Sequence, residues 1–147
     1  MRRQPLTVPI VQIAEVAVVV TDLDRSVRFY TEVLGMPLWE READHATVRC
    51  GNGFVGLWLP GVWRIPPSAN SEPLALEGGH RQHFNFWIHK SDAEAALENL
   101  KRHGVTYFGP RYNKRGEMHV DFVDPDGHLL EYWARESFGP PPEKDAS

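Results

Sequence analysis

Hydrophobic and polar residues follow the same order twice along this chain. In the first copy, a β-branched run predicts a strand over residues 11–20, in which Glu15 shares a face with Ala17 and Val19. The stretch TDLDRSVRFYTEVLG then predicts an amphipathic helix over about residues 24–34, which ends at Gly35. A strand followed directly by a helix is the start of a compact βα unit.

The second copy begins at His83, where HFNFWIH alternates cleanly between two faces of a predicted strand. One face carries His83, Asn85, Trp87 and His89. A helix follows, for which we expect a capping box formed by Ser91 and Glu94 and an end at Gly104. The two copies are offset by about 70 residues, which is typical of a repeated supersecondary unit.

Three further strands are predicted after each helix. In the first half they are PLWERE, HATVRC and FVGLWL, and in the second VTYF, EMHVDFV and HLLEYW, with a basic loop GPRYNKRG after VTYF. Each half therefore reads as a βαβββ module. We expect an α+β fold in which two such modules in one chain form mixed, curved sheets around a cup-shaped site.

The boundaries of these modules follow from breaks in the pattern. We expect an N-terminal arm at 1–10, a first module at 11–59, a Pro/Gly-rich linker or lid at 60–79, a second module at 80–134 and a disordered tail at 135–147. The linker holds four prolines and three glycines and is long enough to reach across a site.

Composition narrows the possible partners and location. The chain has 147 residues and a formal net charge of −4, which offers no general attraction for nucleic acid or an anionic membrane. No apolar run approaches the ~20 residues needed to cross a bilayer, and the N-terminus does not resemble a signal peptide. Cys50 is the single cysteine, so no internal disulfide or thiolate metal cluster forms. We expect a cytoplasmic protein.

Two phrases in this chain carry a family resemblance. Residues 18–36, VVVTDLDRSVRFYTEVLGM, and residues 120–133, VDFVDPDGHLLEYW, resemble the vicinal oxygen chelate superfamily. That superfamily includes glyoxalases, extradiol ring-cleaving dioxygenases, fosfomycin-modifying thiol transferases and bleomycin-binding resistance proteins. The resemblance covers about residues 11–134, and neither phrase distinguishes one member from another.

The resemblance implies four ligand positions for a divalent metal. They fall on Glu15, Gly56, His83 and Glu131 of this sequence. His83 and Glu131 match the usual pattern, whereas Glu15 stands where histidine is most common and Gly56 has no side chain to ligate. The implied metal set is therefore Glu15, His83 and Glu131, with Mn, Fe, Ni or Zn as the implied ions.

These three ligands indicate which kind of reaction a bound metal would support. One imidazole and two carboxylates leave positions open for substrate oxygens, and an open metal site polarises such an oxygen. The resemblance implies a divalent-metal-dependent enzyme that acts on a small oxygenated molecule, as a lyase, ring-cleaving dioxygenase or thiol transferase. Glu131 and Glu15 are the candidate catalytic residues, and Glu15 could serve as a general base if it binds no metal.

Other interpretations of these residues stay open. A glutamate at a strand head such as Glu15 is usually a surface residue, and His83 lies in a histidine-rich stretch where exposure is common. A purely structural role is hardest to assign to Glu131, because a carboxylate among apolar neighbours needs a metal or a cation to offset its desolvation. The alternative function is a metal-free small-molecule binding protein of the bleomycin-resistance kind, in which no bond is made.

The remaining candidates describe a pocket. The predicted substrate-contacting residues are Trp58, Asn85, Trp87, Arg111, Tyr112 and Trp133. The tryptophans suit a flat or hydrophobic substrate, although filling the core is their more common role, and the basic loop could bind a carboxylate or phosphonate or could be merely solvated. Exposed strand edges and the aromatic content favour a homodimer.

Overall fold

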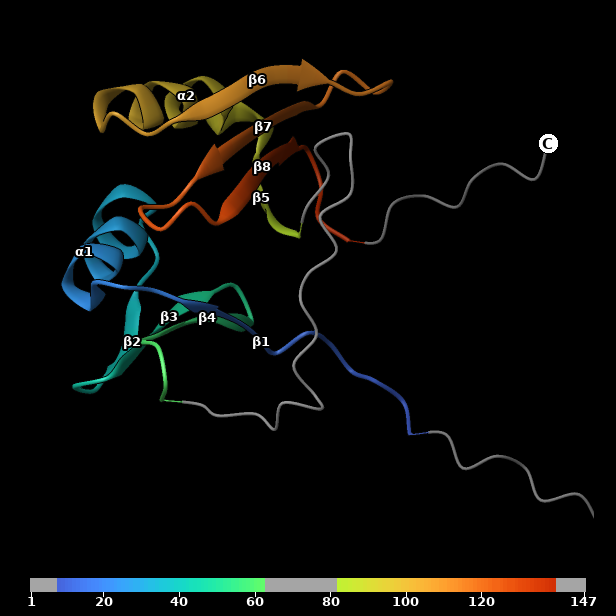
Figure 1. The fold of residues 1–147 in the computed structure, drawn as a ribbon. Helices are drawn as coiled ribbons and strands as arrows, with labels where there is room; N and C mark the ends of the chain where they lie inside the picture. Colours follow the sequence, from blue (N-terminus) through green and yellow to red (C-terminus); the bar gives the residue numbers. More distant parts are fainter. Residues whose placement is uncertain (1–7, 63–81, 140–147) are drawn as a thin grey trace, which may run out of the picture.

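The computed structural model describes residues 8–62 and 82–139 (Figure 1). Most of the predicted linker at 60–79 lies outside the described residues, as do most of the N-terminal arm and the end of the tail. The predicted role of residues 60–79 as a lid therefore concerns a segment that lies mostly outside the described residues. Within residues 8–62 and 82–139, no helix is long and apolar enough to span a membrane.

The first module contains one helix and four strands. Strand β1 (Glu15–Val19) leads to helix α1 (Leu23–Arg28), which continues as a π-helical turn over Phe29–Val33. Strands β2 (Leu38–Arg41), β3 (His45–Cys50) and β4 (Gly53–Trp58) follow. The sheet order is β1-β4-β3-β2, and β1 runs parallel to β4 while the other pairs are antiparallel.

The second module repeats this topology. Strand β5 (His83–His89), a 3-10 turn at Lys90–Asp92 and helix α2 (Ala93–Arg102) precede β6 (Tyr107–Tyr112), β7 (Met118–Val123) and β8 (Leu129–Arg135). The sheet order is β5-β8-β7-β6, again with one parallel pair, β5 with β8. The prediction of an α+β fold with two βαβββ modules is confirmed.

Local details differ from the sequence-based expectation. The first strand begins at Glu15 rather than at residue 11, and Ile13 before it is exposed. No capping box forms at α2, because Ser91 lies within the 3-10 turn and the N-cap residue Asp92 makes no side-chain cap bond. Strand β6 continues to Tyr112 through the stretch expected to be a loop, since a register shift after Phe108 lets pairing with β7 resume.

The end of the second module extends past residue 134. Arg135 is the last residue of β8 and is 5% exposed, and its guanidinium donates a 3.0 Å hydrogen bond from Nη1 to the carbonyl oxygen of Gly139. Phe138 packs 5.9 Å from the ring of Trp87. Residues 135–139, which we expected to belong to the tail, thus pack against the second sheet.

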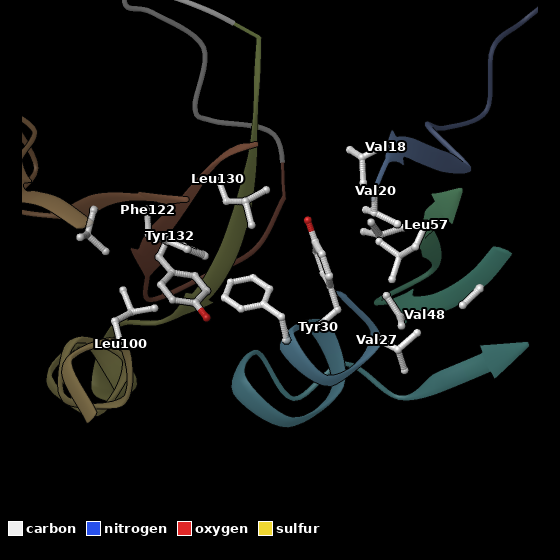
Figure 2. Packing of buried hydrophobic residues seen from close by; sticks show 14 of the residues in the cluster. Val18, Val20, Val27, Tyr30, Val48, Leu57, Leu100, Phe122, Leu130 and Tyr132 are labelled. Atoms are coloured by element: carbon white, nitrogen blue, oxygen red, sulfur yellow. The ribbon is translucent and has the colours of Figure 1, made fainter. Parts of the chain in front are cut away.

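One hydrophobic core joins the two modules. Tyr30, in the π-helical turn, is fully buried, and Figure 2 shows it with Leu130 and Tyr132 on one side and Val20 and Leu57 on the other. Its hydroxyl donates a 2.8 Å hydrogen bond to Asp124 Oδ2, at the turn before β8. The first helix therefore buries apolar surface against both sheets.

The turn before β8 also binds the end of β1. Asp126 Oδ1 accepts hydrogen bonds from the Thr21 hydroxyl at 2.6 Å and from the Thr21 amide at 3.1 Å. Arg25 lies 3.3 Å from the same oxygen, and His128 Nε2 lies 2.7 Å from the carbonyl oxygen of Val19. These contacts hold the two modules together while leaving the exposed face of each sheet open.

Candidate functional site

The exposed face of the second sheet gathers the polar side chains. Alternation along β5 places His83, Asn85 and Trp87 on this face, and the register places Asn85 beside Glu131 of β8. The opposite face carries Phe84, Phe86 and Ile88 of β5, which pack against the core. Because the side chains of a strand alternate, the same pattern that buries the phenylalanines presents the histidine and asparagine to solvent.

Glu131 is the centre of this polar face. Its side chain is only 4% exposed, and its two oxygens have different partners. Asn85 Nδ2 donates to Oε1 at 3.2 Å, His119 Nδ1 lies 2.6 Å from Oε1 and Arg111 Nη2 lies 3.3 Å from it. His83 Nε2 lies 3.3 Å from Oε2. The structure thus brings His83, Asn85, Arg111 and Glu131 together, all of which the sequence singles out.

His119 belongs to this group, although sequence reasoning missed it. It lies on β7 opposite Trp133 in register, and its ring stacks on that indole with centroids 5.1 Å apart. The alternation of EMHVDFV could have placed His119 on the same face as Asp121, next to β8. The resemblance, however, directs attention to the four ligand positions, none of which lies on this strand.

Glu15 lies on the exposed face of the first sheet. Its carboxylate covers Gly56 of β4, because a Cβ added at residue 56 would lie 2.2 Å from Glu15 Oε1. Such a Cβ would also lie 2.7 Å from Trp58 Nε1, and the Trp58 ring stacks on His45 with centroids 4.2 Å apart. The glycine at position 56 therefore makes room for Glu15 rather than leaving an empty ligand position.

A groove lies between the neighbouring edges of the two sheets, where β1 faces β5. Its volume is about 500 Å³, and its lining includes Glu15 of β1, Phe54 of β4 and His83 and Asn85 of β5. Glu15 and the polar face around Glu131 thus open to a common space. Glu15 makes none of the contacts that surround Glu131 and remains part of the other module.

The arginines of the second sheet are already paired with acids. Arg111 contacts Asp121 as well as Glu131, and Arg115 Nε donates to Glu117 Oε1 at 2.6 Å. Arg135 Nε donates to Glu117 Oε2 at 3.3 Å. These pairs neutralise the guanidiniums within the sheet. The predicted binding of a carboxylate or phosphonate by Arg111 would therefore require it to leave its own acidic partners.

Aromatic residues continue the polar face toward the end of β8. Trp87 and Trp133 pack edge to face at 6.0 Å, and the guanidinium carbon of Arg135 lies 5.0 and 4.7 Å from their ring centroids. A hollow of about 540 Å³ beside Trp87 also touches Cys50 and Phe138. Tyr112, by contrast, pairs with the buried Met118 of β7, is itself 65% exposed and does not join the group around Glu131.

The imidazole and carboxylate groups of this region are possible donors to a metal ion. Within residues 8–62 and 82–139, no group of three or more histidine, cysteine, aspartate or glutamate side chains is arranged to hold a metal ion. His83 and Glu131 provide two adjacent donors. The described part of one chain does not bring Glu15 to them.

Comparison with known proteins places this fold in a family context. The family model of the Glyoxalase/Bleomycin resistance protein/Dioxygenase superfamily matches residues 12–132. Glutathione transferase FosA from Serratia marcescens is 32% identical over 112 residues, which cover 76% of this chain and 72% of the relative. Lactoylglutathione lyase GLX1 from Arabidopsis thaliana is 32% identical over 138 residues, which cover 84% of this chain and 43% of the relative.

A solved structure supports the same relationship. A glyoxalase/bleomycin resistance protein/dioxygenase from Nocardioides superposes with a TM-score of 0.68 at 26% identity, over 94% of this chain and 92% of that one. FosX from Mesorhizobium loti superposes with a TM-score of 0.63 at 20% identity, which shows a shared fold.

Proposed function

Since this chain belongs to the glyoxalase/bleomycin resistance protein/dioxygenase superfamily, we propose that it is an enzyme that acts on a small oxygenated molecule with a divalent metal held by His83, Glu131 and Glu15. The observation that carries the proposal is the 3.3 Å approach of His83 Nε2 to Glu131 Oε2. A buried carboxylate and an adjacent imidazole supply two of the ligands that a divalent metal ion needs.

The chemistry of the donors suits Mn, Fe, Ni or Zn. One imidazole and two carboxylates bind borderline divalent ions and leave positions for substrate oxygens. Such a metal, when bound, polarises a substrate oxygen and lowers the pKa of a coordinated hydroxyl. His119 and Asn85 hold the Glu131 carboxylate by hydrogen bonds to Oε1, so this side chain is pre-oriented.

Glu15 completes the set in this proposal. Its carboxylate has apolar neighbours, since a pocket of about 270 Å³ beside it is lined by Ala17, Val19 and Trp58. When it does not bind the metal, Glu15 could take a proton from a substrate held in the groove. Trp58, Trp87 and Trp133 would contact the flat or apolar part of that substrate.

A homodimer would resolve the separation of Glu15 from Glu131. The exposed faces of both sheets carry apolar side chains, among them Val19 at 55% and Trp87 at 43% exposure. We propose that a second copy covers these faces and that its Glu15 meets His83 and Glu131 of the first. Each site would then draw ligands from two chains.

Elemental analysis of untagged protein, purified without chelator, tests the metal. We expect near-stoichiometric Mn, Fe, Ni or Zn in the parent and its loss in His83→Ala and Glu131→Ala. His103→Ala, on the C-cap of α2, is the matched histidine control and should keep the metal. A parent that stays metal-free after incubation with these ions contradicts the proposal.

Subunit mixing tests the shared site. Glu15→Ala and Glu131→Ala should each lack metal, but unfolding and refolding them together should form heterodimers with one intact site, so metal content should partly return. If Glu15 acts within its own chain, the mixture stays as empty as either variant. Sedimentation of the parent gives the oligomeric state independently.

A metal-free binding function is the second candidate. It is favoured by the packing of Glu15 over Gly56 and by the guanidinium of Arg111, which lies 3.3 Å from Glu131 where a cation would be repelled. In that case a flat ligand held by Trp87 and Trp133 should quench tryptophan fluorescence in metal-free protein, and no turnover would accompany binding.

A further inference from the structure

A chain of hydrogen bonds leads from the backbone of the β6–β7 turn to Glu131. It begins at Asn113, whose Oδ1 accepts the backbone N–H groups of Arg115 and Glu117, each at 3.0 Å. Two N–H donors on one side-chain oxygen define which end of the amide is oxygen. The Asn113 amide therefore points its NH₂ group away from the turn.

That NH₂ group reaches His119. Asn113 Nδ2 lies 2.8 Å from Glu117 Oε1 and 3.3 Å from His119 Nε2. Because an amide nitrogen can only donate, Nε2 of His119 must accept and carries no hydrogen. A neutral imidazole has one N–H, so the hydrogen lies on Nδ1, which is 2.6 Å from Glu131 Oε1.

The imidazole ring is held in this orientation. Its side chain is 15% exposed, and it stacks nearly parallel on Trp133 with an interplanar angle of 24°. A ring flip would break both hydrogen bonds at once. The two oxygens of Glu131 therefore have different neighbours. Oε1 is contacted by His119, Asn85 and Arg111, whereas Oε2 faces His83.

We propose that His119 is a positioning residue, fixed by Asn113 as the Nδ1–H tautomer, which orients Glu131 so that Oε2 is the oxygen presented beside His83. The tautomer follows from contacts within one chain. Its effect on ligand affinity rests on the proposed metal-binding function. Glu131 Oε2 is then the oxygen available to a metal or a substrate proton.

Nitrogen-15 NMR of histidine-labelled protein tests the tautomer directly. We expect His119, assigned by its loss in His119→Phe, to show a protonated Nδ1 and a bare Nε2. Asn113→Asp keeps an oxygen for the turn N–H groups but replaces the donor with an acceptor, so Nε2 should gain a hydrogen. A parent with the hydrogen on Nε2, or a signal that Asn113→Asp leaves unchanged, overturns the assignment.

Binding of Mn²⁺ alone, measured by calorimetry, tests the positioning role. His119→Phe keeps a ring on Trp133 but lacks the donor, and we expect affinity to fall roughly 10–100-fold. His119→Asn places an amide nitrogen near the position of Nδ1 and should restore most of the affinity. Equal affinity in the parent and His119→Phe, or an equal loss in both variants, contradicts the role.

The two proposals fail separately. If the parent binds no Mn²⁺, the metal proposal fails, and the NMR result still decides the tautomer. If the parent binds Mn²⁺ through His83 and Glu131 while His119 carries its hydrogen on Nε2, the metal proposal stands and the positioning role is wrong.

Discussion

The carboxylate of Glu15 occupies the space that a side chain at Gly56 would need. A Cβ at residue 56 would lie 2.2 Å from Glu15 Oε1, far inside van der Waals contact, and 2.7 Å from Trp58 Nε1. The two departures from the usual ligand pattern, glutamate at 15 and glycine at 56, are therefore one structural unit. A side chain at position 56 therefore requires Glu15 to move or to be replaced by a smaller residue.

This relationship predicts coupling between the two positions. Gly56→Ala should displace Glu15 and lower the free energy of unfolding by about 1–3 kcal/mol, the usual cost of overpacking. In a Glu15→Ala background the same change should cost less, because only the Trp58 contact remains. Urea denaturation of both singles and the double variant measures the coupling. An equal cost in both backgrounds would mean that Glu15 does not fill this space.

Removal of Glu131 should destabilise the protein even without metal. Glu131→Ala leaves the Nδ1 donor of His119, a side chain that is only 15% exposed, without its acceptor, which should cost about 1–3 kcal/mol. His83→Ala removes a side chain that is 38% exposed and should change stability by less than about 0.5 kcal/mol. Urea denaturation of chelator-treated protein measures the free energy of unfolding of both variants. An equal loss of stability in Glu131→Ala and His83→Ala would contradict the prediction.

The protein should lose stability in acid through Glu117. The hydrogen bond from Asn113 and a second from Arg115 outweigh desolvation and lower the pKa of Glu117 from 4.5 to about 2. Because the folded pKa lies below the unfolded one, the unfolded chain binds the proton first, so stability falls with falling pH. The contribution is complete above about pH 4.5 and is lost toward pH 2.

Glu117→Gln isolates this contribution. The variant should show a smaller change in the urea midpoint between pH 6 and pH 3 than the parent, whatever its stability at pH 6. The comparison uses the pH dependence alone, because the substitution also removes an acidic partner of Arg135. Parallel pH profiles for the two proteins would show that Glu117 is not the group that titrates.

The bond between Tyr30 and Asp124 should contribute measurably to module pairing. Burial and the carboxylate of Asp124 raise the pKa of Tyr30, so its hydroxyl stays a donor at all ordinary pH values. Tyr30→Phe should lower the free energy of unfolding by about 1.5–3 kcal/mol, the value of a hydrogen bond to a charged group. Tyr107→Phe in β6 is the matched control, and an equal effect there would contradict the prediction.

Much of the fold is readable from the sequence because it depends on local periodicity. Strict alternation identifies β5, and a run ended by a left-handed glycine identifies the helices, since Gly35 and Gly104 have φ values of +75° and +66°. The expected capping box does not form because Ser91 lies within a 3-10 turn, which the spacing of Ser91 and Glu94 does not reveal. The predicted end of β6 was wrong because a β-bulge depends on the pairing of two strands and not on the sequence of one strand.

The candidate site also has one part that the sequence indicates and another part that only the structure shows. The sequence by itself determined the two modules and the faces of their strands, because side-chain alternation follows from backbone geometry alone, while the grouping of His83 with Glu131 was implied by the family resemblance. Only the tertiary structure decided that His119 completes this group, that Glu15 fills the space over Gly56, and that the arginines are already paired. Those facts depend on the register between strands distant in sequence, which sets distances of a few ångströms that no local pattern encodes.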